Sequence, residues 1–174
     1  MAKELDSVDL TRARELGGRG REVWVRRACL VVVAAIPVLA LFNVFGQVPS
    51  RASADSPAAA LIVSAPNHVR GGLLFQARFT IIAHREIKNA TLDLSRSWAE
   101  EMTINTLEPA PSQETSDNGR LSFQLGEIPA GQTFTFFMQF QVNPVAVGSR
   151  SQVAELLDGP ISLVRLTRHV TVLP

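Results

Sequence analysis

Apolar and polar residues alternate through most of the second half of the chain. Within residues 73–84, for example, Phe75, Ala77, Phe79 and Ile81 alternate with mostly polar neighbours. Because successive side chains of a strand point to opposite faces, this period of two predicts half-buried strands of an antiparallel sheet. Seven strands are predicted in this way, over residues 60–65, 73–84, 88–95, 102–106, 120–127, 132–143 and 161–173. Residues 150–157 fit either an eighth strand or a helical turn.

Turn-forming residues separate the predicted strands. Glycine supplies positive φ angles and proline fixes φ, so their clusters mark turns with a physical cause. The clusters are Gly71-Gly72, Asp117-Asn118-Gly119, Pro129-Ala130-Gly131 and Asp158-Gly159-Pro160. Short strands at this density over residues 60–174 predict a mainly β fold, an immunoglobulin-like (Ig-like) antiparallel β-sandwich of about seven strands.

The pattern is different in residues 28–48, which are predominantly apolar and contain no charge over 21 residues. A helix of this length spans roughly 31 Å, about the thickness of a bilayer core. Every backbone polar group must find an internal partner in lipid, and a helix meets that need. The sequence therefore predicts one N-terminal transmembrane helix, with Pro37 in its middle.

Charge sets the predicted orientation of this helix. Residues 1–27 hold seven Lys or Arg and five acids, and Arg26 and Arg27 lie directly before the apolar run. On the other side only Arg51 is close. The positive-inside rule then places the N-terminus in the cytoplasm and residues 60–174 outside the cell membrane. Residues 1–27 are expected to be a basic cytoplasmic tail, with a short helix over 4–16 as an alternative, and residues 49–59 a linker.

A cleaved signal peptide is the rival interpretation. Ala52-Ser53-Ala54 is a possible cleavage pattern, preceded by the helix-breaking Pro49. However, the apolar run exceeds the usual 7–15 residues of a signal peptide and follows a long basic region. The retained anchor is therefore favoured. Both interpretations place the rest of the chain outside the cytoplasm.

The segment 121–142 reads LSFQLGEIPAGQTFTFFMQFQV. Its strand, its Leu125-Gly126 and Pro129-Ala130-Gly131 turn, and its long alternating strand resemble the end of bacterial extracytoplasmic Ig-like domains of the conserved-repeat and CARDB type. The resemblance covers residues 60–145, and the chain departs from the pattern after Asn143-Pro144. It implies an Ig-like fold outside the cytoplasm, and it carries over no catalytic residue.

Motifs for catalysis or cofactors are absent from the sequence. The three histidines, His68, His84 and His169, have no ligand partner two or four positions away, and Cys29 is the only cysteine. No G-x-S-x-G elbow and no phosphate-binding glycine loop occurs. The net charge of +1 argues against a nucleic-acid partner. We therefore expect a protein that is not an enzyme and that binds no metal or cofactor.

Two features are candidates for binding. Apolar side chains occupy the polar phase of two strands, beside cationic and amide groups, and would form a patch if the strands are neighbours. The candidates are Leu74, Arg78, Ile82, His84, Phe137 and Gln139. Trp98 is the other candidate, since an exposed tryptophan in a loop often anchors binding, although a buried sandwich tryptophan is equally common.

These observations favour a membrane-anchored binding or scaffold protein, an accessory partner of another envelope protein. The alternative is a cell-wall or carbohydrate-binding module with Trp98 as its platform, secreted if the helix is removed. Neither interpretation identifies the partner.

Overall fold

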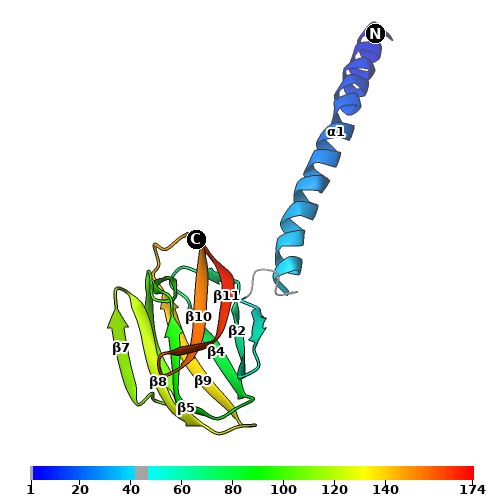
Figure 1. Ribbon diagram of the computed structural model, residues 1–174. Coiled ribbons are helices and arrows are strands. Elements are labelled where there is room, and N and C mark those ends of the chain that lie inside the picture. The colour runs from blue at the N-terminus through cyan, green and yellow to red at the C-terminus, as the bar shows by residue number, and fades with distance from the viewer. Residues whose placement is uncertain (1, 42–46) are drawn as a thin grey trace. The chain divides into compact units, whose positions relative to one another are not determined.

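The computed structural model describes residues 2–41 and 47–174, with side chains from Glu22 onward in the first range. The chain divides into two units, one ending at Gly46 and the other running from Gln47 to Pro174 (Figure 1). The last part of the predicted span, residues 42–46, lies outside the described residues.

The first unit is one helix, α1 (Ala2–Leu41). Its segment Glu22–Leu41 is long and apolar enough to cross a membrane, and none of the window that meets this test is buried. Pro37 lies inside the helix. The sequence analysis expected residues 1–27 to be a tail with a short helix over 4–16 as the alternative. In the structure this tail belongs to α1 from Ala2 onward, so the helix is longer than expected. A helix that extends an existing one needs no new nucleus, so residues of modest apolarity can join it.

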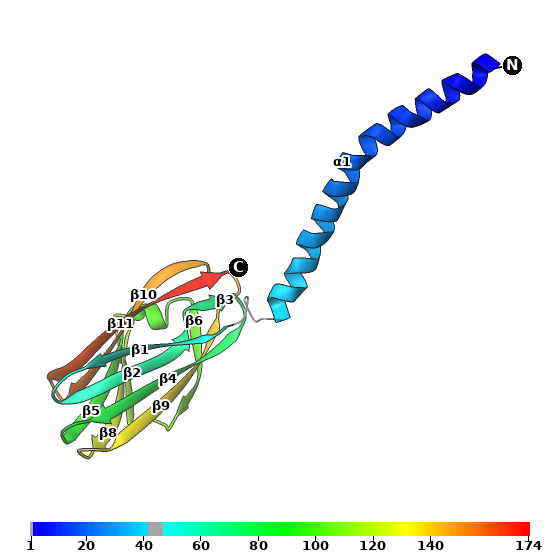
Figure 2. The same ribbon diagram turned by 90° about the vertical axis from the view of Figure 1, so that its right-hand side faces the viewer.

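The second unit is a sandwich of two sheets, with eleven strands between residues 47 and 174 (Figures 1 and 2). The first sheet contains, in spatial order, β1 (Pro49–Asp55), β2 (Ala59–Pro66), β4 (Leu74–Ala83), β9 (Thr133–Val142) and β6 (Met102–Glu108). The second contains β3 (His68–Arg70), β11 (Ile161–Leu173), β10 (Gly148–Asp158), β5 (Ile87–Leu94), β8 (Arg120–Ile128) and β7 (Gln113–Asp117). A single 3₁₀ turn, Arg96–Trp98, follows β5.

The core lies between the sheets and is built from the apolar phase of their strands. In β4 the pattern alternates strictly, with Phe75, Phe79 and Ile81 buried between exposed or half-buried neighbours. The ring of Phe79 lies 5.2 Å from that of Trp98, between ring centroids. Burying large aromatic side chains of this kind contributes roughly 1.5–3 kcal/mol each. The predicted mainly β sandwich preceded by one apolar helix is therefore confirmed.

The number of strands is larger than predicted. Residues 49–59 were expected to be a linker, yet β1 pairs along its whole length with β2, with Ala52 opposite Val63. β1 is an edge strand of small residues, and its backbone hydrogen bonds do not require an apolar period. Residues 150–157 belong to a strand, β10, and not to a helical turn. The short strands β3 and β7 were also not predicted, and every residue of β7 is exposed.

Candidate binding face

The outer face of the first sheet brings part of the predicted patch together. β4 and β9 are neighbours, and their register places Arg78 opposite Phe137 and Gln76 opposite Gln139. The guanidinium carbon of Arg78 lies 5.1 Å from the centroid of the Phe137 ring, a cation–π contact. A cation, an aromatic ring and two amides thus occupy the middle of one sheet face.

The other predicted residues lie at the two ends of this face. Leu74, Arg78 and Ile82 share one side of β4 at intervals of four residues. At about 3.3 Å per residue, Leu74 and Ile82 are roughly 26 Å apart. His84 follows the strand end, and its Nε2 lies 2.9 Å from Asp55 Oδ1. The six residues therefore do not form one compact site. Only Arg78, Phe137 and Gln139 lie together, at the centre of the sheet face.

Two hollows flank this centre. One, of about 480 Å³, lies beside Arg51, Ser64, Gln76 and Arg78. The other, of about 100 Å³, lies beside Gln76, Phe137 and Gln139 and is completed by Thr106 and Glu108 of β6. We call the residues around both hollows the binding face: Arg51, Gln76, Arg78, Thr106, Glu108, Phe137 and Gln139.

The electrostatics of the binding face are simple. Arg51 lies on β1 at one edge of the sheet, Arg78 lies on the central strand β4, and Glu108 lies on β6 at the opposite edge. Neither guanidinium forms an ion pair with another residue in the part of the chain that the structure describes. Uncharged Ser, Thr and Gln side chains fill the space between. The face can therefore accept carboxylate or carbonyl oxygens of a partner without first breaking an internal ion pair.

Trp98 is not part of any surface, so of the two alternatives left open for it the structure supports the buried sandwich tryptophan and rules out the exposed anchor. It is fully buried. Its Nε1–H donates a hydrogen bond to the Val153 carbonyl oxygen at 3.1 Å, and its ring packs against Phe79 and Phe140. A buried indole cannot serve as a platform for a polysaccharide, so the carbohydrate-binding alternative loses its main residue.

Arg168 is a buried residue that the sequence analysis missed. Its guanidinium lies over the Trp98 ring, 5.5 Å from the centroid. It donates hydrogen bonds to Gln152 Oε1 at 2.9 Å, to the Ala65 carbonyl at 3.0 Å, to Asn67 Oδ1 at 3.0 Å and to the Pro66 carbonyl. Burial lowers the pKa of Arg168 to about 10, so it stays charged at neutral pH. The sequence did carry a signal of this burial, because Arg168 occupies the apolar phase of the alternating residues 164–172.

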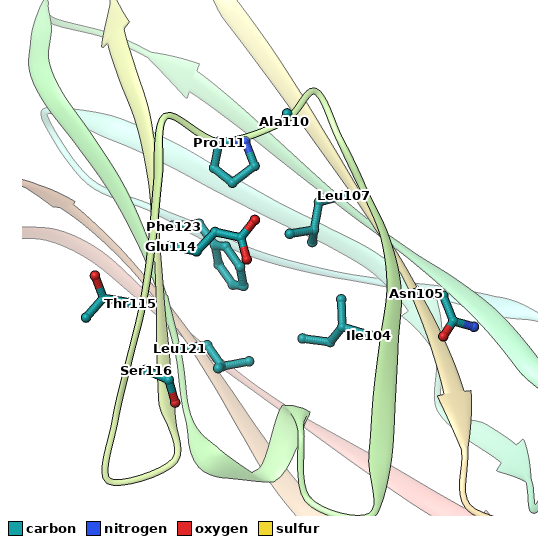
Figure 3. A pocket seen from close by; sticks show the side chains of 10 residues that line it. All are labelled: Ile104, Asn105, Leu107, Ala110, Pro111, Glu114, Thr115, Ser116, Leu121 and Phe123. Atoms are coloured by element: carbon teal, nitrogen blue, oxygen red, sulfur yellow. The ribbon is translucent and has the colours of Figure 1, made fainter.

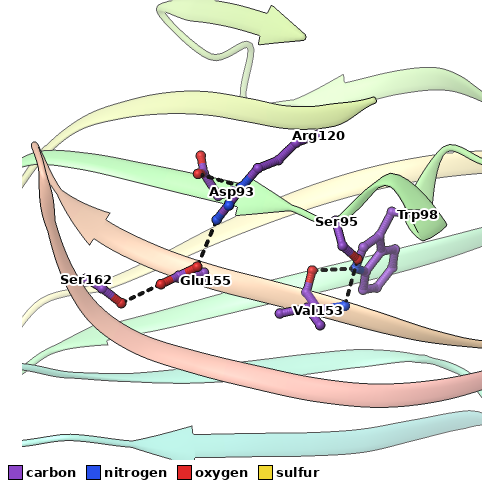
Figure 4. A network of polar contacts seen from close by, with 7 residues as sticks. All are labelled: Asp93, Ser95, Trp98, Arg120, Val153, Glu155 and Ser162. Atoms are coloured by element: carbon purple, nitrogen blue, oxygen red, sulfur yellow. Dashed lines mark hydrogen bonds and ion pairs between the residues drawn. The ribbon is translucent and has the colours of Figure 1, made fainter. Parts of the chain in front are cut away.

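The outer face of the second sheet carries a different set of groups (Figure 4). Arg120 bridges Asp93 at 3.1 Å and Glu155 at 2.8 Å, and Ser162 donates to Glu155 at 2.6 Å. The Ser162 hydrogen bond and the Arg120 guanidinium lower the pKa of Glu155, against the opposing effect of partial burial. Arg120 is thus held by two carboxylates of its own chain, whereas Arg51 and Arg78 of the binding face form no ion pair within the described residues.

A separate groove opens where the two sheets part between β6 and β7 (Figure 3). Its volume is about 480 Å³, and Ile104, Leu107, Leu121 and Phe123 line it. Glu114 projects from β7 at its margin. The groove forms because β6 and β7, although neighbours in sequence, are edge strands of different sheets, and no local pattern predicts that the chain crosses between sheets here. It offers an apolar surface with a single carboxylate.

Metal-ligating side chains are dispersed. In residues 22–41 and 47–174, no group of three or more His, Cys, Asp or Glu is gathered closely enough to hold a metal ion.

No protein-family model and no curated protein sequence matches this chain. Several solved structures are similar in fold. CaCohA2 from Clostridium acetobutylicum is 14% identical, with a TM-score of 0.45 over 68% of this chain and 92% of that one. AvmM, described as catalysing macrocyclization in alchivemycin A biosynthesis, is 9% identical, with a TM-score of 0.45 over 68% and 89%.

A CARDB domain from Pyrococcus furiosus is 12% identical, with a TM-score of 0.34 over 72% of this chain and 94% of that one. It is one of the domain types that residues 121–142 resemble. Similarity at this level carries no argument about activity, ligand or partner. The class of the protein, a β-sandwich domain with an N-terminal apolar helix, follows from its own strands and registers.

Proposed function

We propose that this protein is a membrane-anchored binding or scaffold subunit, whose sandwich lies outside the cytoplasm and contacts another envelope protein through the binding face. It would act by surface complementarity and not by catalysis. The helix would hold the sandwich at the membrane where the partner is found.

One observation supports this proposal above the others: Arg78, which has no ion-pair partner among the described residues, stacks on the half-buried Phe137 at the centre of a largely uncharged sheet face. Arginine and aromatic residues are enriched among the residues that dominate binding energy, and charged residues are depleted in the core of interfaces. The two adjacent hollows can receive side chains of a partner. On the opposite sheet face, Arg120 is already engaged by Asp93 and Glu155 and would have to give up these ion pairs to bind a partner.

The anchor is supported by the exposed apolar surface of α1. Leu30, Val31 and Val32 are each more than 60% exposed, and no described residue of the helix is buried. Lipid would cover such a surface. If the helix is instead a cleaved signal peptide, the same sandwich would act as a secreted binding domain. The mass of the mature chain distinguishes these cases, because cleavage after Ala54 leaves a product that starts at Asp55.

Site-specific photocross-linking of the full-length protein in its membrane tests the binding face. A photoreactive residue replaces Gln139 on the binding face in one variant and Lys88, an exposed residue of β5 in the second sheet, in the matched control. We expect a discrete adduct of one added protein from position 139 and none from position 88. Arg78→Ala with Phe137→Ala in the same chain should abolish the adduct.

Two results would contradict the proposal. Equal adducts from both positions would show contact without a preferred face. No adduct from position 139, in a protein that co-purifies with a stoichiometric partner, would place recognition elsewhere on the chain. The apolar groove between β6 and β7 would then be the next surface to probe, with the photoreactive residue at Glu114.

A further inference from the structure

The exposed apolar side chains of the sandwich are unevenly distributed. Among residues 47–174, seven large apolar side chains are exposed: Val48, Leu73, Leu74, Val145, Val147, Ile161 and Leu173. All of them except Ile161 lie at one end of the sandwich, the end at which the chain enters β1. Scattered exposed hydrophobes are ordinary on a protein surface, but a cluster marks a surface that another phase or molecule covers.

Strand registers establish this placement. β1 begins at Pro49 opposite Pro66, the end of β2. β4 begins at Leu74 opposite Gln141, near the end of β9. The end of β11, Leu173, pairs with Arg70 of β3. These strand ends therefore meet at one end of the sandwich, and in Figures 1 and 2 the C-terminus marks it.

Hydrogen bonds hold the loops of this end together. The Gly71 N–H donates to the Leu173 carbonyl at 3.0 Å, and the Val142 N–H donates to the Leu73 carbonyl at 3.0 Å. A Cβ atom at Gly71 would lie 2.7 Å from the Pro144 carbonyl oxygen, so the loops that carry Leu73 and Val145 pack backbone against backbone. The apolar end is thus a fixed surface.

The loop between β9 and β10 shows how its valines come to point outward. The Ala146 N–H donates to the Asn143 carbonyl at 3.0 Å, and the Ala146 side chain is fully buried. Its neighbours Val145 and Val147 are 79% and 59% exposed. A loop that buries alanine and exposes two valines is the reverse of the usual preference in water. We call Leu73, Leu74, Val145, Val147 and Leu173 the apolar rim.

Polar groups surround the rim without neutralising its apolar character. Arg150 bonds to Glu101 Oε2 at 2.7 Å and to the Glu100 carbonyl. Arg70 and His68 are exposed beside Leu173. An apolar centre with the exposed cation Arg70 and polar groups at its border suits the interfacial layer of a bilayer, where aliphatic side chains enter the acyl boundary and cations meet lipid phosphates.

Chain length brings that layer within reach. The apolar helix ends at Leu41, and β1 begins at Pro49. The seven intervening residues extend at most about 25 Å. If α1 is the retained anchor of the proposed function, the end of the sandwich that carries the rim cannot leave the neighbourhood of the outer leaflet.

We propose that the apolar rim rests in the headgroup layer of the outer leaflet, with Leu73, Val145 and Val147 inserted toward the acyl chains. This inference rests on the proposed membrane anchor. Its consequence is an orientation: the strands stand away from the membrane, and the binding face is presented sideways to a neighbouring envelope protein.

Spin labels measure this placement directly in the full chain, reconstituted into phosphatidylcholine vesicles in which about one lipid in three is the anionic phosphatidylglycerol. Cys29, the only native cysteine, is replaced by Ser. One variant then carries Val145→Cys at the rim, and the matched control carries Ala130→Cys in the β8–β9 turn at the opposite end. We expect the label at position 145 to be more accessible to oxygen than to a water-soluble nickel complex, and the label at position 130 to show the reverse.

A second variant tests whether the spin label itself, and not the apolar rim, causes the insertion. With the label moved to Leu173, the pair Val145→Glu and Val147→Glu should raise its accessibility to nickel, while circular dichroism shows an unchanged sandwich. Equal nickel accessibility at positions 145 and 130, in protein that still resists extraction by alkaline carbonate, would overturn the rim and leave the anchor standing. Release of the protein by carbonate, with a chain that starts at Asp55, would overturn the anchor and the rim together.

Discussion

Two arginines of this sandwich lie over aromatic rings at nearly the same distance, and they occupy opposite environments. Arg168 lies 5.5 Å from the centroid of the buried Trp98, and Arg78 lies 5.1 Å from that of the half-buried Phe137. Arg168 has four further residues as hydrogen-bond acceptors around it, whereas Arg78 lies on a sheet face that faces solvent. The same pair of groups is therefore fully partnered in one place and open in the other.

The difference indicates which contact holds the fold and which one is available to a partner. A buried cation must be satisfied by the protein itself, because no water can replace a lost acceptor. An exposed cation exchanges its water for a partner at little cost. Arg168 should therefore dominate stability, and Arg78 should dominate binding. Four measurements sharpen this comparison, beginning with the largest effect.

Arg168→Met is expected to have the largest effect. It keeps a similar length but removes the donors to Gln152, to the Ala65 and Pro66 carbonyls and to Asn67. Leaving these acceptors unsatisfied should cost about 2–4 kcal/mol in the free energy of unfolding. Urea denaturation followed by circular dichroism measures the loss, with Arg78→Met as control. Equal losses in the two variants would contradict the division between the two arginines.

Trp98→Phe should have the next largest effect. It removes the Nε1–H bond to the Val153 carbonyl and part of the ring beneath Arg168. Because Val153 also accepts the Ser95 N–H at 2.9 Å, its oxygen does not become unsatisfied. We expect a loss of about 2 kcal/mol. Phe137→Leu, at the half-buried contact, is the matched control and should cost less than half of that in urea denaturation of both variants.

The ion network on the second sheet gives a smaller effect that depends on pH. The folded state lowers the pKa of Glu155 below its ordinary value of 4.5, chiefly through the Ser162 hydroxyl. The folded protein therefore binds this proton less tightly than the unfolded chain. The stabilisation is complete above pH 4.5 and is lost as pH falls through the lowered pKa.

Ser162→Ala tests that network. Without the hydroxyl, the pKa of Glu155 should return toward 4.5, and stability at pH 7 should fall by about 1 kcal/mol. The difference from the wild type should shrink as both proteins are titrated below pH 4.5. Unfolding free energies measured across that range decide the point. A difference that stays constant down to low pH would mean that Ser162 acts through packing and not through Glu155.

The strands of the sandwich differ in whether the sequence alone could predict them. The alternation in residues 73–84, 132–143 and 161–173 predicted the long strands, because a strand buried on one face must alternate. β1 and β7 could not be found in this way, since edge strands obtain their stability from backbone pairing and can be built from small or polar residues.

The site was predicted only in part for a related reason. The phase of Arg78 and Phe137 placed them on outward faces, but their contact required β4 and β9 to be neighbours, which residue order does not determine. Trp98 was ambiguous, because burial of a loop residue depends on which strands cover it. Arg168 stood in a buried phase that the alternation itself defined. An arginine among alternating valines and leucines was the readable signal of an internal hydrogen-bonded cation.

The smallest expected effect on stability belongs to Arg78→Ala, and its interest lies in the contrast with its effect on binding. An exposed cation–π contact contributes about 0.5–1 kcal/mol, so the free energy of unfolding should change by no more than that. Affinity for the partner identified by cross-linking should fall at least tenfold, about 1.4 kcal/mol. A double-mutant cycle with Phe137→Ala separates the two contributions. If Arg78 acts only with the ring beneath it, the double variant should bind no more weakly than either single variant, because each substitution already removes the shared contact. If the two losses add, the guanidinium and the ring contact separate groups of the partner, and the binding face holds two subsites in place of one.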